Sequence, residues 1–92
     1  MAIERDLAAL KTRRRNVRPE EAHALLSEAG FDRRSGKGDH WVYTHPKRRF
    51  PLTIDPRNPL LPTYVSKVIK AIEEVLAAEA GEDEEASRHD DR

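Results

Sequence analysis

Histidines are the residues of this 92-residue chain best suited to proton transfer, because imidazole titrates near neutral pH. The chain has four: His23, His40, His45 and His89. His40 follows a glycine-containing turn and opens a segment rich in aromatic and β-branched residues. The end of a strand beside a loop is where a rigid scaffold presents reactive groups. The sequence therefore makes His40 the candidate general base or acid, with a histidine of no catalytic role as the alternative.

The other histidines have simpler interpretations. His23 lies beside the apolar stripe of a predicted helix and is expected on the surface, whereas His45 precedes Pro46 and is expected to shape a turn. His40 and His45 are separated by an odd number of positions, so on one strand they point to opposite faces and do not favour a shared metal. The absence of cysteine excludes a disulfide scaffold, a thiolate zinc site and a cysteine nucleophile. We therefore expect neither a metal nor a cofactor.

Basic residues flank His40 on both sides. They are Arg33, Arg34, Lys37, Lys47, Arg48 and Arg49. A hairpin would bring the two flanks together around the imidazole, where cations position phosphates and a histidine moves protons. This combination suits metal-free cleavage of RNA, in which the 2′-hydroxyl attacks the neighbouring phosphate. The alternative is a basic hairpin that binds RNA and does nothing further.

The net charge of zero conceals a division along the chain. Residues 1–70 hold fifteen Lys/Arg and eight Asp/Glu, a balance of +7, and residues 71–92 hold two and nine, a balance of −7. A basic body favours an anionic partner such as RNA, with a solvated surface of mixed charge as the alternative. No apolar run approaches the roughly 18 residues of a membrane span, and no signal-peptide pattern opens the chain. We expect a cytoplasmic protein.

Hydrophobic periodicity predicts an α-α-β-β-β-α order. The expected helices cover residues 3–11, 19–29 and 63–80, and the expected strands cover residues 31–35, 40–45 and 49–54. Pro19 suits a first helical position, and Gly30 and Gly81 are expected to end helices. Pro51 cannot donate to a strand ladder, which marks the third strand as an edge.

These elements predict one small α+β domain. Its helices are expected to cover one face of a three-stranded antiparallel sheet and to leave the other face to water. Residues 1–17 form a short helix and basic linker, residues 18–80 form the domain, and residues 81–92 are expected to be a disordered acidic tail.

Several segments together resemble one known family. The stretches EAHALLSEAGF at 21–31, GKGDH at 36–40 and VYTHP at 42–46 resemble the HicA (YcfA-like) toxins, over roughly residues 17–76. The resemblance implies a fold similar to the double-stranded-RNA-binding domain. It also implies a type II toxin that cleaves mRNA without the ribosome, needs no metal and is inhibited by a HicB-type antitoxin.

The family carries its catalytic histidine in a Gly-Ser-His motif, which matches His40 after Gly38 and Asp39. An aspartate at the serine position could raise the pKa of the histidine, orient its ring or repel the scissile phosphate. The third strand leads into Asp55-Pro56-Arg57, without the histidine that many relatives carry there. We therefore expect a catalytic His40, with RNA bound by Gly38 and the six basic residues that flank His40. A non-catalytic RNA-binding module and a purely protein-binding domain are the alternatives.

Overall fold

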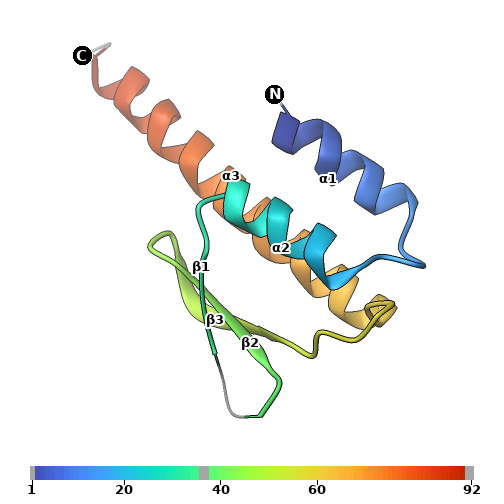
Figure 1. Cartoon of the computed structure of the whole chain (residues 1–92). Coiled ribbons are helices and arrows are strands. Elements are labelled where there is room, and N and C mark those ends of the chain that lie inside the picture. The colour runs from blue at the N-terminus through green and yellow to red at the C-terminus, as the bar shows by residue number, and fades with distance from the viewer. Residues whose placement is uncertain (1, 36–37, 91–92) are drawn as a thin grey trace.

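The structure is a computed structural model that describes residues 2–35 and 38–90 (Figure 1). Its elements follow the predicted order: α1 (Ala2–Thr12), α2 (Pro19–Glu28), β1 (Asp32–Ser35), β2 (Trp41–His45), β3 (Arg48–Ile54) and α3 (Pro62–Asp90). Each strand begins within one residue of its expected position. The α+β class and the three-stranded antiparallel sheet are confirmed.

The turn after α2 directs the chain into the sheet. Pro19 starts the helix, and Leu25 and Leu26 lie on its buried face. Gly30 adopts a φ of 94°, a left-handed conformation that glycine tolerates best. The N–H of Phe31 then donates to the carbonyl of Leu26 at 3.0 Å, which closes the helix end. Gly30 therefore acts as the predicted helix stop.

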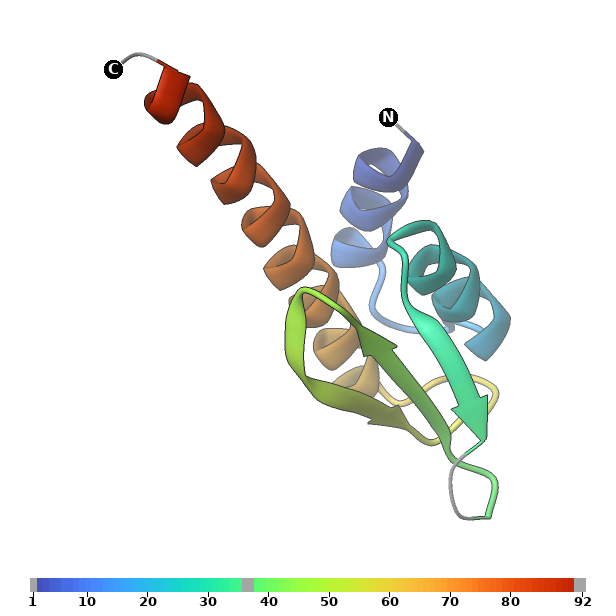
Figure 2. The ribbon, with the colours of Figure 1, turned by 90° about the vertical axis from the view of Figure 1, so that its left-hand side faces the viewer.

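The sheet has the order β1-β2-β3, with both pairs antiparallel. Tyr43, Leu52 and Ile54 are buried on the face that meets the helices. Figures 1 and 2 show all three helices on this side of the sheet. Arg34 and Thr53 are exposed on the other face, and β3 with its Pro51 is an edge strand, as predicted.

Helix α3 supplies the largest part of the core. Val65, Val68, Ile69 and Ile72 are buried as the periodicity predicts, and Val75 extends the same stripe. The apolar residues of α1 pack into the same cluster, which stabilises a helix too short to persist alone. These residues are Ile3, Leu7 and Leu10.

Two expectations about these elements were wrong. Helix α3 continues through Gly81 to Asp90, because alanine and glutamate favour helix and a single glycine costs only about 1 kcal/mol. Strand alternation in the sequence predicts Phe50, Leu52 and Ile54 on one face, but Phe50 is 69% exposed whereas the other two are buried. The register between β2 and β3 shifts next to Phe50, so strand alternation no longer carries its side chain into the core.

Candidate active site

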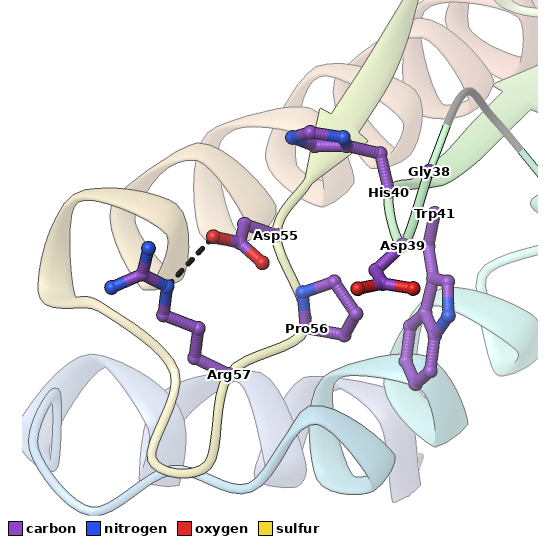
Figure 3. A pocket seen from close by; sticks show the side chains of 7 residues that line it. All are labelled: Gly38, Asp39, His40, Trp41, Asp55, Pro56 and Arg57. Atoms are coloured by element: carbon purple, nitrogen blue, oxygen red, sulfur yellow. Dashed lines mark hydrogen bonds and ion pairs between the residues drawn. The ribbon is translucent and has the colours of Figure 1, made fainter.

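An open pocket of about 990 Å³ lies at the end of the sheet where His40 precedes β2 (Figure 3). Its lining comes from the loop before β2 and from the segment that follows β3. The lining residues are Gly38, Asp39, His40, Trp41, Asp55, Pro56 and Arg57. The pocket therefore joins an imidazole, two carboxylates, a guanidinium and an indole.

Strand register explains why these two segments meet. Trp41 pairs with Ile54 across the antiparallel β2 and β3, so the residue before Trp41 and the residue after Ile54 leave the sheet at the same end. Ile54 is fully buried and anchors this pair. Figure 3 shows the His40 ring on the side of the pocket that carries Asp55.

The segment after β3 is tied to the rest of the fold. The N–H of Leu60 donates to the carbonyl of Val17 at 2.7 Å, and both side chains are buried. Nearer the pocket, Arg57 Nε donates to Asp55 Oδ2 at 2.8 Å. This ion pair uses one of the five guanidinium N–H donors, and the Arg57 side chain is 67% exposed. The pocket therefore carries an exposed guanidinium whose charge is partly offset by Asp55.

Trp41 forms another wall of the pocket, and two neighbouring side chains contact its ring. The guanidinium carbon of Arg33 lies 4.6 Å from its ring centroid, within cation–π range. The His23 ring meets it in a T-shaped contact at 6.1 Å, and His23 Nδ1 lies 2.9 Å from the hydroxyl of the fully buried Tyr43. The expectation of a surface His23 was wrong, because His23 is half-buried and orders the Trp41 wall.

The pKa of His23 lies below its usual value, because partial burial disfavours the imidazolium and the nearby Arg33 repels it. The unfolded chain then binds a proton more readily than the folded chain below pH 6.5. We expect the free energy of unfolding to fall as the pH drops from 6.5 toward the folded-state pKa. Urea unfolding at several pH values should show a shallower fall for His23→Gln than for the native chain. A His89→Gln control should follow the native profile, and parallel profiles for His23→Gln and the native chain would contradict the assignment.

His45 has the turn-shaping role that the sequence predicts. Its Nδ1 accepts a hydrogen bond from the backbone N–H of Lys47 at 2.9 Å. The proton of the neutral ring therefore lies on Nε2, which donates to the carbonyl of Ala29 at 3.0 Å. His45 thus links the β2–β3 turn to the end of α2.

The predicted cluster of cations around His40 is only partly present. Lys47, Arg48 and Arg49 lie at the opposite end of β2, because the β2–β3 turn follows His45 and not His40. Five residues of strand separate the two ends, a distance of about 16 Å. Arg48 is also engaged, since it is 17% exposed, its Nε lies 3.4 Å from Glu74 Oε2 and its Nη1 donates to the Phe50 carbonyl.

The other predicted RNA-binding residues have mixed positions. Arg33 lies against Trp41, whereas Arg34 is exposed on the opposite face of the sheet. Gly38 lines the pocket with a φ of 65°, and Lys37 lies outside the described residues. Asp55 and Arg57 were not among the predicted site residues. Antiparallel pairing of the second and third strands could have indicated Asp55 and Arg57, because it places the end of the third strand beside the start of the second.

Within the described part of the chain, no group of three or more His, Asp or Glu side chains is placed to hold a metal ion. No helix there is long and apolar enough to cross a membrane. Comparisons with protein-family models, curated proteins and solved structures found no match. The resemblance to the HicA toxins therefore rests on the motifs quoted above.

Proposed function

We propose that this chain is a metal-independent endoribonuclease of the HicA type, the toxin of a type II toxin-antitoxin system. One observation carries the proposal. His40, Arg57 and Trp41 line a single open pocket, and they supply a proton-transfer group, a cation and an aromatic surface. When the substrate supplies its own nucleophile, a proton-transfer group and a cation assist cleavage, and an aromatic surface helps to bind single-stranded RNA.

In this proposal His40 acts as the general base. A neutral imidazole nitrogen takes the proton of the ribose 2′-hydroxyl, and the resulting oxygen attacks the adjacent phosphorus. The bond from phosphorus to the 5′-oxygen then breaks, and that oxygen takes a proton from water in the open pocket. The imidazolium of His40 gives its proton to the hydroxide that is left, which restores the neutral ring and the water. The products are a 2′,3′-cyclic phosphate and a 5′-hydroxyl end.

Arg57 is the group in the pocket that can stabilise the phosphate. Negative charge accumulates on the non-bridging oxygens during the attack, and a fixed cation beside them lowers the barrier. Asp55 orients the guanidinium through Nε, which leaves donors on the other nitrogens for a phosphate. Arg33, Arg34, Lys47 and Arg49 would act at longer range, by attracting RNA to the basic body of the protein.

The family resemblance also leads us to propose a HicB-type antitoxin as the protein partner and the cytoplasm as the site of action. A non-catalytic RNA-binding module is the second candidate. The carboxylates of Asp39 and Asp55 favour this second candidate, because they share the pocket with His40. Their negative charges weaken the attraction of the pocket for the scissile phosphate, which would slow cleavage.

The proposed mechanism predicts both the requirements and the products of cleavage. The purified protein should cut single-stranded RNA in the presence of EDTA and leave cyclic phosphate ends, identified by mass spectrometry of the fragments. A DNA oligonucleotide of the same sequence is the control and should stay intact, because it lacks the 2′-hydroxyl. A requirement for magnesium, or cutting of the DNA, would overturn the mechanism. Binding of RNA without cleavage would favour the second candidate.

A further inference from the structure

We propose that Asp39 and Trp41 form a guanine-binding subsite beside His40. The inference rests on the proposed function, because it places a base of single-stranded RNA in the pocket that carries His40. It goes further by naming the base and the two side chains that bind it.

The two side chains face the same part of the pocket. Asp39 and Trp41 flank His40 in the chain, and both line the pocket with it. Figure 3 shows the Asp39 carboxylate beside the Trp41 indole, with the Pro56 ring across from the indole. Asp39 is exposed, and Trp41 is half-buried. A flat ring entering here would meet the indole with its face and the carboxylate with its edge.

Trp41 is suited to base stacking because its ring is already ordered. Arg33 covers the ring at 4.6 Å, and His23 contacts it at 6.1 Å from the helix behind it. A fixed aromatic ring loses little conformational freedom when a base stacks on it. Stacking alone tolerates all four bases, so the selection must come from a polar group at the edge of the base.

The Asp39 side chain supplies that selection, because a carboxylate accepts hydrogen bonds and donates none. Guanine presents two donors side by side on its Watson–Crick edge, the N1–H and the N2 amino group. Adenine and cytosine place a ring acceptor next to their amino group, and uracil places its N3–H between two carbonyls. Guanine is therefore the base that satisfies both carboxylate oxygens, and the others leave an acceptor facing an acceptor.

The subsite also gives Asp39 a role in the Gly38-Asp39-His40 sequence. Since Asp39 is adjacent to His40, a guanine bound by the Asp39 carboxylate lies next to the phosphate at which His40 promotes cleavage. Asp39 then contributes recognition, and proton transfer stays with His40. Cleavage should consequently occur beside guanine.

Trp41 is the only tryptophan in the chain, so its fluorescence reports on a base that stacks on it. The probes are 2′-O-methyl tetranucleotides, which have no free 2′-hydroxyl and are not cleaved, with one guanine, inosine or adenine among uracils. We expect quenching by the guanine probe with an affinity at least about tenfold higher than for the adenine probe, as for a bidentate base contact. Inosine lacks the N2 amino group and should bind with intermediate affinity.

Asp39→Asn should remove the preference for guanine, because an amide presents one acceptor and one donor. Asp32→Asn is the matched control, since it makes the same charge change at an exposed position. Asp32 pairs with Thr44, at the end of β1 that is far from Trp41. Equal affinities for guanine and adenine in the native protein, or a preference that survives Asp39→Asn, would overturn the subsite.

The binding assay is independent of cleavage, so the two proposals fail separately. Selective binding of guanine by a protein that cuts no RNA would support the subsite and reject the endoribonuclease. Cleavage of RNA by a protein without the guanine preference would reject the subsite and support the endoribonuclease.

Discussion

Replacement of His40 by alanine is expected to lower the rate of RNA cleavage by at least about 100-fold, the usual contribution of a positioned general base. His40 supplies the imidazole among the residues that line the pocket, and imidazole is the side chain most often used for proton transfer. The same substitution should change the free energy of unfolding by less than about 1 kcal/mol, because the side chain is exposed.

Two measurements check this result. Expression of the native chain in cells should arrest growth and degrade mRNA, whereas expression of His40→Ala should do neither. His89→Ala is the matched control, because it removes a histidine far from the pocket in sequence and should retain full activity. Equal cleavage by His40→Ala would reject His40 as the base, and a large loss of stability would instead assign it a structural role.

Replacement of Leu60 by alanine is expected to lower the free energy of unfolding by about 2–5 kcal/mol, as for other fully buried leucines. Leu60 is 1% exposed, and it packs where the β3–α3 segment meets the α1–α2 linker. Its backbone N–H donates to the Val17 carbonyl, a bond that alanine keeps. The substitution removes only the buried side chain, whose packing also holds the segment that presents Asp55 and Arg57. In a domain this small, such a loss is a large part of the total stability.

Leu61 is the matched control, because the adjacent leucine is 39% exposed. Leu61→Ala should change the free energy of unfolding by less than about 1 kcal/mol. Urea unfolding followed by circular dichroism measures both variants. Equal losses for Leu60→Ala and Leu61→Ala would contradict the proposed anchoring of this segment.

Features that depend on neighbouring residues were predictable from the sequence alone. The spacing of Leu25 and Leu26 with their neighbours predicts α2, and Gly30 predicts its end, because helix periodicity and left-handed backbone are local properties. Pro51 predicts an edge strand for the equally local reason that proline has no N–H. His40 was also identified locally, from its place after a turn and before a strand.

The composition of the pocket was decided by tertiary structure. Periodicity says nothing about register, and the pairing of Trp41 with Ile54 is what brings Asp55 and Arg57 to His40. The same pairing places Arg48 at the far end of β2, although Arg48 is closer to His40 in sequence than Arg57 is. Register depends on which side chains are buried against the helices, and a shift by one residue would expose Tyr43, Leu52 and Ile54. His40 could thus be identified from the sequence, whereas the packing of the sheet on α3 determined that Asp55 and Arg57 lie beside it.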